Sequence, residues 1–370
     1  MTIGEFVIYF QNQLVPLVWY DGREVKSMAS YLLKEFAGVE SYKLIVEPQL
    51  MLDPPVEAAL VECTDKISKG EPLQYALGYE YFCGHKFVVA PGVLIPRPET
   101  EELVRMVVAN CHSTIQASEC AENGQESETA GPKILDICTG SGCIAWSLAA
   151  ALPQSRVFGC DISDEALAIA RSQKISTVSH TLNSGNDSGE ESLQVSFFKC
   201  DILDCSAVDV ICGEANKSSI FGGFDSFGGY DIIVSNPPYV CEEERAQMRV
   251  NVLEHEPELA LFVPDDDPLR FYRRIVELSG RDEDIAGDSD MNGGYPVKKE
   301  DSAEKEESAA WRGGLLKDGG MLYFEVNERF AKEVAELMRD AGFVECEVVR
   351  DMFGKERMVR GRKIFQRKKE

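Results

Sequence analysis

From residue 133 onward, short apolar runs alternate with longer stretches of helical spacing, and this alternation constrains the fold more than any other feature. The runs occupy residues 134–136, 157–160, 195–198, 232–234 and 321–326. Runs this short are typical of strands in a parallel sheet that is covered on both faces. The pattern also predicts helices at 143–152, 164–173 and 328–341, and final strands at 344–349 and 357–365. We therefore predict a doubly wound α/β sheet for this part of the chain.

The first part of the chain shows helical spacing instead. Apolar residues recur every three or four positions at 3–10 and again at 28–36. Asp53 is followed by two prolines, as at an N-cap with proline in the first helical turn, and Gly70 is placed to end that helix. We expect a small helical domain at residues 1–75.

A short region of different character follows. Two apolar runs around Gly84 predict a β-hairpin. The segment 95–101 then reads Ile-Pro-Arg-Pro-Glu-Thr-Glu, and its two prolines indicate a rigid extended piece before a helix at about 99–110. We expect the hairpin and linker at 76–100 and a larger domain at 101–370.

Four stretches interrupt the α/β pattern. They are rich in Ser, Gly, Asn, Asp and Glu and lie near residues 112–131, 177–193, 213–229 and 280–310. This composition buries too little apolar surface to form a core, so we interpret the stretches as solvated loop insertions.

The charge of the chain bears on its partners. Its formal net charge is −25 at pH 7, and an acidic protein repels a polyphosphate at long range. The N-terminus has no basic stretch ahead of an apolar one, and no run of 18 apolar residues occurs. We expect a cytoplasmic monomer with no nucleic-acid or membrane partner, for which a basic protein partner fits better.

Cysteine and histidine spacing argues against a metal site. The 12 cysteines are spread from Cys63 to Cys346 without a C-x-x-C pair, and the 4 histidines form no cluster. Metal sites need closely spaced ligands, so we predict no metal. We interpret the cysteines as reduced, mostly buried small apolar side chains in a reducing compartment.

A turn containing glycines directly follows the first strand and opens the next helix. We predict that it binds a cofactor through Asp136, Cys138, Thr139, Gly140, Ser141 and Gly142. Glycine lets the backbone approach a ligand closely, and a helix N-terminus supplies free N–H groups and the positive end of a dipole. The anion could be the pyrophosphate of NAD or the carboxylate of S-adenosylmethionine.

Acidic residues at the next two strand ends support a nucleoside cofactor. Asp161 ends the second strand, 19 residues after Gly142, where a carboxylate can accept both ribose hydroxyls. Asp201 ends the third strand and suits the adenine amino group, with Ile202 packing on the ring. NAD remains an alternative here, because its G-x-G-x-x-G fingerprint tolerates Ala145 at the third position.

The fourth strand runs directly into Asn236-Pro237-Pro238-Tyr239. Ligands in such sheets bind beyond the carboxyl ends of the strands, so this tetrapeptide faces the cofactor. An amide or exocyclic amine nitrogen is a poor nucleophile because its lone pair is delocalised. Two acceptors that hold its N–H groups can aim the lone pair at a methyl carbon and bind the transition state better than the ground state.

Each residue of the tetrapeptide can have a distinct part in that chemistry. The Asn236 side-chain oxygen and the Pro237 carbonyl are the two acceptors, and Pro238 stiffens the loop. Tyr239 offers an aromatic face to the planar group. We predict methyl transfer from S-adenosylmethionine to a planar nitrogen, with Asn236, Pro237 and Tyr239 as catalytic residues.

Several motifs together carry a family resemblance. They are the helical N-terminal region, Gly70–Tyr75 with the hairpin after it, Leu94–Glu101, Asn236–Tyr239 and Glu256–Leu261. With them the chain resembles the peptide chain release factor N5-glutamine methyltransferases of the HemK/PrmC type, over nearly its whole length outside the insertions. The resemblance implies a Rossmann-like class I methyltransferase sheet of seven strands, joined to the helical domain by the hairpin.

The resemblance also implies a substrate and a set of contacts. The substrate would be the side-chain amide of the glutamine in the Gly-Gly-Gln motif of bacterial class 1 release factors, docked by the helical domain. Asn236 and Pro237 would hold this amide and Tyr239 would pack on it. The Cys138–Gly142 turn would hold the methionine moiety, Asp161 the ribose and Ile202 the adenine.

Two hypotheses from other classes stay open at this point. Adenine-N6 methylation of DNA or RNA shares the tetrapeptide, but it would require a basic recognition region, and only the short tail 360–369 is basic. A binding protein that kept the fold without activity is the other hypothesis. One departure from the family concerns Cys138, where glycine is frequent, and we expect the cysteine to hold a negative φ there.

Overall fold

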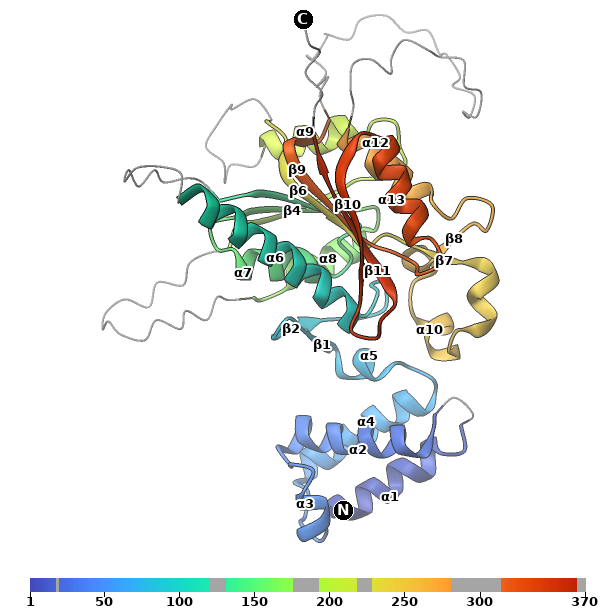
Figure 1. Ribbon diagram of the computed structural model, residues 1–370. Helices are drawn as coiled ribbons and strands as arrows, with labels where there is room; N and C mark the ends of the chain where they lie inside the picture. The colour runs from blue at the N-terminus through green and yellow to red at the C-terminus, as the bar shows by residue number, and fades with distance from the viewer. Residues whose placement is uncertain (18–19, 120–130, 176–192, 218–227, 281–313, 365–370) are drawn as a thin grey trace, which may run out of the picture.

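The computed structural model describes residues 1–17, 20–119, 131–175, 193–217, 228–280 and 314–364. Figure 1 shows a group of helices at the N-terminal end and a larger α/β part built on one sheet, with a two-stranded hairpin between them. None of the described helices combines the length and apolar composition that crossing a lipid bilayer requires.

The N-terminal part is helical, as its apolar spacing predicts. Its helices are α1 (Ile3–Leu14), α2 (Gly22–Ala37), α3 (Lys43–Val46), α4 (Pro54–Ser68) and α5 (Leu73–Leu77). Apolar side chains of α1, α2 and α4, among them Phe6, Leu32 and Leu60, are fully buried in one core. Asp53 occupies the N-cap of α4 with proline in the first turn, although its side chain makes no capping hydrogen bond.

The predicted hairpin is present. Strand β1 (Tyr79–Phe82) pairs antiparallel with β2 (His85–Val88). The two turn residues between them, Cys83 and Gly84, have φ of 50° and 80°, as a tight turn between twisted strands requires. Phe82 and Phe87 are fully buried in the core of the α/β part, so the hairpin is anchored to it by these two rings.

The seven-stranded sheet that the family resemblance implies is confirmed. Its spatial order is β10-β11-β9-β6-β3-β4-β5. The strands are β3 (Lys133–Ile137), β4 (Arg156–Asp161), β5 (Val195–Lys199), β6 (Tyr230–Ser235), β9 (Leu316–Glu325), β10 (Phe343–Arg350) and β11 (Glu356–Lys363). Strands β3, β4, β5, β6 and β9 pair in parallel, whereas β11 pairs antiparallel with both β9 and β10.

Helices cover both faces of this sheet, which explains why the central parts of its parallel strands are largely apolar. On one face α6 (Pro98–Glu119) and α7 (Cys143–Ala151) pack on Ile134, Val157 and Ile232. On the other face α9 (Ala207–Lys217), α12 (Arg270–Ser279) and α13 (Ala331–Asp340) pack on Leu135, Phe158 and Ile233. Helix α8 (Asp164–Ser172) lies beside α7, where Ala170 accepts a hydrogen bond from the Trp146 ring nitrogen.

Two predicted insertions begin later than the sequence indicates. Helix α6 continues to Glu119, through the first residues of the stretch 112–131, and α9 continues to Lys217, into the stretch 213–229. A packed helix extends readily, because each further residue adds a hydrogen bond without a new nucleation step. Nearly all the rest of the four stretches lies outside the described residues.

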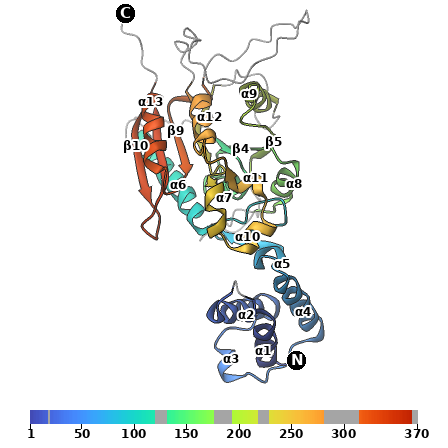
Figure 2. The same cartoon turned by 90° about the vertical axis from the view of Figure 1, so that its right-hand side faces the viewer.

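Residues 240–263, which we call the excursion, follow β6 and contact the helical part. The excursion consists of β7 (Val240–Cys241), the 3-10 helix η2 (Glu242–Gln247), α10 (Val250–His255), α11 (Glu258–Leu261) and β8 (Phe262–Val263), with β7 and β8 paired in parallel. Figure 2 shows α10 close to α5 and the helical part. Arg249, just before α10, forms an ion pair with Glu24 of α2 at 2.6 Å.

Candidate active site

A cavity of about 330 Å³ opens at the carboxyl ends of the parallel strands β3, β4, β5 and β6. Most of the residues predicted for the cofactor and the chemistry line it, namely Cys138, Thr139, Gly140, Ser141, Asp161, Asp201, Ile202, Asn236 and Pro238. The linker and the segment after α10 also contribute, through Gly92, Val93, Leu94, Pro96, Arg97, Thr100, Pro257, Leu259 and Ala260. Asp136, Gly142, Pro237 and Tyr239 are not part of the lining.

The turn after β3 is held by its own hydrogen bonds. The Thr139 N–H donates to the Cys160 carbonyl at 3.0 Å, and the Gly142 N–H donates to the Thr139 carbonyl at 2.8 Å. Gly140 and Gly142 have φ of 54° and 78°. A Cβ built on Gly140 would meet no atom within 4 Å, so the backbone there is open to a ligand.

The prediction of a negative φ for Cys138 is wrong. Its φ is 61°, the left-handed conformation that glycine adopts without cost. The turn imposes this angle, because the neighbouring Thr139 is fixed by hydrogen bonds to Cys160 and Asp136. Burial raises the pKa of the Cys138 thiol well above its usual value, so the thiol stays protonated and unreactive.

Asp136 stabilises this turn through a hydrogen bond with Thr139. It is fully buried, and its Oδ2 accepts a hydrogen bond from the Thr139 hydroxyl at 2.6 Å. Burial raises the pKa of its carboxyl to about 7, in spite of the opposing hydrogen bond from Thr139. Direct contact between Asp136 and a cofactor stays a prediction.

Asp161 lies at the end of β4, on the wall of the cavity. Its Oδ2 accepts the Gly140 N–H at 2.9 Å and its Oδ1 accepts the Ser163 N–H at 3.0 Å. Burial raises the pKa of its carboxyl, and these two bonds oppose the rise. A carboxylate oxygen can accept more than one hydrogen bond, so Asp161 keeps acceptor capacity toward a ligand.

Asp201 and Ile202 form the next part of the wall. Asp201 is exposed and its Oδ1 accepts the Leu203 N–H at 2.9 Å. Ile202 is 5% exposed and presents apolar surface to the cavity. Both residues thus border the cavity, and their contact with an adenine stays a prediction.

The tetrapeptide begins where β6 ends. The Ser235 hydroxyl donates to the Ile137 carbonyl of β3 at 2.7 Å and so ties this end of β6 to the sheet. Asn236 is half-buried and lines the cavity together with Pro238. Pro238 thus borders the cavity, and its part in stiffening the loop stays a prediction.

A hydrogen-bond chain that the sequence analysis missed holds both ends of the tetrapeptide. The Asn236 Nδ2 donates to the Thr100 Oγ1 at 3.3 Å, and the Thr100 hydroxyl donates to the Glu325 Oε2 at 2.6 Å. The Tyr239 hydroxyl donates to the other oxygen, Glu325 Oε1, at 3.1 Å. The signal that could have found Glu325 is its place at the carboxyl end of a parallel strand, the same rule that identified Asp161.

The Glu325 side chain is shielded from solvent. It is 1% exposed, and burial raises the pKa of its carboxyl although Thr100, Tyr239 and Arg357 act to lower it. The Tyr272 hydroxyl donates to its backbone carbonyl at 3.2 Å. A buried carboxylate needs such partners to remain charged.

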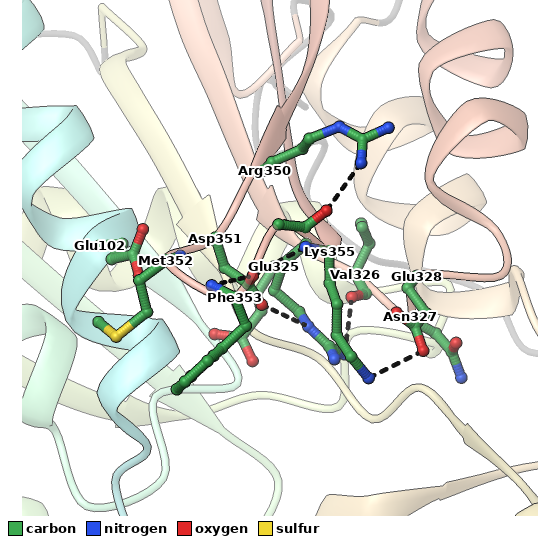
Figure 3. A network of polar contacts seen from close by, with 12 residues as sticks. Glu102, Glu325, Val326, Asn327, Glu328, Arg350, Asp351, Met352, Phe353 and Lys355 are labelled. Carbon is green, nitrogen blue, oxygen red and sulfur yellow. Dashed lines mark hydrogen bonds and ion pairs between the residues drawn. The ribbon is translucent and has the colours of Figure 1, made fainter.

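A network of polar contacts connects the turn between β10 and β11 with the end of β9 (Figure 3). The Asp351 Oδ1 accepts the Phe353 and Lys355 N–H groups, each at 2.9 Å. Lys355 bonds to Glu328 at 3.0 Å, close to Asn327. The turn is therefore tied to the segment that directly follows β9, whose last residue is Glu325.

Asn327 fixes the far end of the tetrapeptide. Its Nδ2 donates to the Tyr239 carbonyl at 3.2 Å and to the Glu244 Oε2 at 2.9 Å. Its Oδ1 accepts the Arg329 N–H at 3.1 Å. The backbone at Tyr239 is thus held from β9 as well as from β6.

The linker is joined to the excursion through a buried carboxylate. Glu256 Oε2 accepts the Ile95 N–H at 3.1 Å, and Glu256 Oε1 accepts from Arg97 Nη2 at 2.5 Å. The Glu256 side chain is 1% exposed. This contact joins the Leu94–Glu101 motif to the Glu256–Leu261 motif.

The described cysteines are free thiols, and most of them are buried, as the sequence predicts. Over the described parts of the chain, no three His, Cys, Asp or Glu side chains are grouped closely enough to hold a metal ion.

Comparison with known proteins places the chain among methyltransferases. Residues 134–212 match the family model described as "Methyltransferase domain". A release factor glutamine methyltransferase from Bacteroides thetaiotaomicron is 36% identical over 96% of this chain and 99% of that protein. A release factor glutamine methyltransferase from Flavobacterium psychrophilum is 33% identical over 97% of this chain and 99% of that protein.

Proposed function

This chain belongs to the release factor glutamine methyltransferase family, and from that premise we propose how its residues perform the reaction. It is an S-adenosyl-L-methionine-dependent enzyme that methylates the side-chain amide nitrogen, N5, of a glutamine in peptide chain release factors. One observation carries the assignment of roles: Asn236 and Pro238 border the same cavity as Asp161 and the Gly140 turn.

The residues that line the cavity offer groups suited to each part of S-adenosyl-L-methionine. The open backbone at Gly140 and the N-terminus of α7 would hold the methionine carboxylate, and Asp161 would accept the ribose hydroxyls. Asp201 and Ile202 would bind the adenine edge and face. When bound, the cofactor supplies the methyl group that is transferred.

The amide is held by acceptors from the tetrapeptide. The Asn236 Oδ1 and the Pro237 carbonyl would each accept a hydrogen bond from one N–H of the glutamine amide, which aims its lone pair at the methyl carbon. Positive charge that develops on nitrogen strengthens both bonds, so these acceptors favour the transition state. Tyr239 would pack on the amide with its ring while its hydroxyl is engaged by Glu325.

The finer identity of the substrate rests on the family resemblance and on charge. We infer that the glutamine is that of the Gly-Gly-Gln motif of class 1 release factors, docked in part by helices α1–α5. The net charge of −25 favours a basic protein surface over nucleic acid. A cytoplasmic monomer remains our expectation.

Mass spectrometry of a class 1 release factor after incubation with enzyme and cofactor tests this function. A gain of one methyl group on the Gly-Gly-Gln glutamine is expected, and none after a Gln→Ala change in the release factor. Labelling of DNA or RNA in place of protein would support the adenine alternative instead.

A matched variant tests the assignment of the site. Asn236→Ala removes one acceptor and should lower kcat by at least about a hundredfold, as loss of one transition-state hydrogen-bonding group does elsewhere. Cofactor affinity, measured by calorimetry, should stay within about threefold of wild type, since the predicted cofactor contacts lie mainly in other residues. Wild-type kcat in this variant would contradict the role of Asn236.

A further inference from the structure

The orientation of the Asn236 amide decides whether this residue can act as an acceptor. An asparagine side chain carries an acceptor on one side and two donors on the other. If Nδ2 faced the substrate amide, two sets of N–H groups would oppose each other. Something in the protein must therefore select the orientation in which Oδ1 faces the substrate.

The hydrogen-bond chain to Glu325 makes this selection. Glu325 accepts a hydrogen bond from each of the two hydroxyls that reach it, so the single proton of the Thr100 hydroxyl points to Glu325 Oε2, at 2.6 Å. The Thr100 oxygen then has only lone pairs to offer Asn236, whose Nδ2 lies 3.3 Å away. A flipped amide would place Oδ1 against this oxygen as two opposed acceptors.

Burial and a second hydrogen bond hold the Glu325 carboxylate in this orientation. Its second oxygen accepts the Tyr239 hydroxyl at 3.1 Å, and its side chain is almost fully buried. Thr100 is 3% exposed and stands at the start of α6, within the predicted segment 95–101. Three elements far apart in the sequence, the ends of β6 and β9 and the start of α6, thus converge on one carboxylate.

We propose that Glu325 and Thr100 are positioning residues, which orient the Asn236 amide so that its oxygen faces the substrate and which hold the Tyr239 ring in place. The inference rests on the proposed role of Asn236 as an acceptor. In this proposal, Thr100 of the linker motif supplies the hydroxyl that connects the Asn236 side chain to the Glu325 side chain.

The first test replaces Thr100. Thr100→Val has nearly the same shape but no hydroxyl, and Thr100→Ser keeps the hydroxyl. We expect Thr100→Val to lower kcat by about tenfold to a hundredfold, with a smaller change in KM for the release factor. Thr100→Ser should stay within about threefold of wild type. Ser279→Ala, which removes a buried hydroxyl that bonds the Ile275 carbonyl in α12, is the matched control and should leave kcat unchanged.

The second test asks whether Glu325 acts through Thr100. Glu325→Gln keeps the size of the side chain but can donate to Thr100, which removes the selection, so kcat should fall at least as far as in Thr100→Val. In the double variant the two effects should not multiply, because both act on one chain of bonds. Tyr239→Phe measures the other branch of the network separately.

The outcomes are distinguishable. If the wild-type enzyme methylates the release factor but Thr100→Val keeps its kcat, the positioning role is refuted. Equal loss in Thr100→Ser and Thr100→Val would assign the effect to packing, and multiplying effects in the double variant would refute the serial chain. Failure of the wild type to methylate any release factor would instead refute the proposed function. Cofactor affinity and melting temperature, measured for every variant, detect loss of folding.

Discussion

Burial sets the chemistry of the individual acidic residues around this cavity. Asp136, Asp161 and Glu325 lie at or near the carboxyl ends of strands of one sheet, and burial raises the pKa of each carboxyl. Their partners differ, however. Backbone N–H groups bond Asp161 and two hydroxyls bond Glu325, whereas the Thr139 hydroxyl bonds Asp136. The pKa of Asp136 rises to about 7, so its protonation should be visible near neutral pH.

We predict that Asp136 makes the stability of the protein depend on pH. Its pKa is about 7 in the folded protein against an ordinary value of 3.8, so the folded state binds this proton more tightly than the unfolded state. Its contribution is therefore full below about pH 4 and is lost as the pH rises through 7, by at most roughly 4 kcal/mol.

Asp136→Asn is the comparison that isolates this residue, because it cannot ionise. Urea unfolding at pH 5 and pH 8 should show the wild type losing stability relative to the variant as the pH rises. Parallel pH dependence in the two proteins would contradict the prediction.

At the scale of elements, the turn between β3 and α7 depends on one glycine for packing. Gly142 has φ of 78° and is the N-cap of α7. A Cβ there would lie 3.0 Å from the Phe197 ring, 3.1 Å from the Ala170 Cβ and 3.1 Å from the Trp146 ring. Gly142 thus lets α7, α8 and β5 approach each other, which is why it does not line the cavity.

Gly142→Ala should lower the free energy of unfolding by about 2–4 kcal/mol, from backbone strain together with overpacking. Gly84 is a matched control, since its φ is 80° and a Cβ there would meet nothing within 4 Å. Gly84→Ala should cost only the strain, about 1–2 kcal/mol. Equal losses in denaturant titrations of the two variants would show that packing at Gly142 does not matter.

At the scale of the whole molecule, two ion pairs connect the excursion after β6 with preceding parts of the chain. Glu256 pairs with Arg97 of the linker, and its side chain is 1% exposed. Arg249 pairs with Glu24 of the helical part, and these side chains are 60% and 30% exposed. The strength of the two pairs should differ, because water screens the second.

We expect Glu256→Ala to lower the free energy of unfolding by about 3 kcal/mol, because it leaves the Ile95 N–H and Arg97 without their buried partner. Arg249→Ala should change it by less than about 1 kcal/mol. Thermal and denaturant unfolding measure both. A larger loss for Arg249→Ala than for Glu256→Ala would contradict this order.

The sequence by itself determined the parallel sheet, the position of the glycine turn and the tetrapeptide at the end of β6, because local apolar periodicity and turn residues carry that information. It also placed Asp161, Asp201 and Ile202 at strand ends that border the cavity. These predictions succeeded because the carboxyl ends of parallel strands must meet at one edge.

Only the tertiary structure decided which of these residues face the cavity and what holds them. The left-handed φ of Cys138 comes from hydrogen bonds that fix its neighbour Thr139 to Cys160 and Asp136, and no local pattern contains that constraint. The same holds for the contact between Thr100 and Glu325, which are 225 residues apart in the sequence. Periodicity reports the environment of a residue but not its partner, and the orientation of Asn236 depends on partners from two other elements.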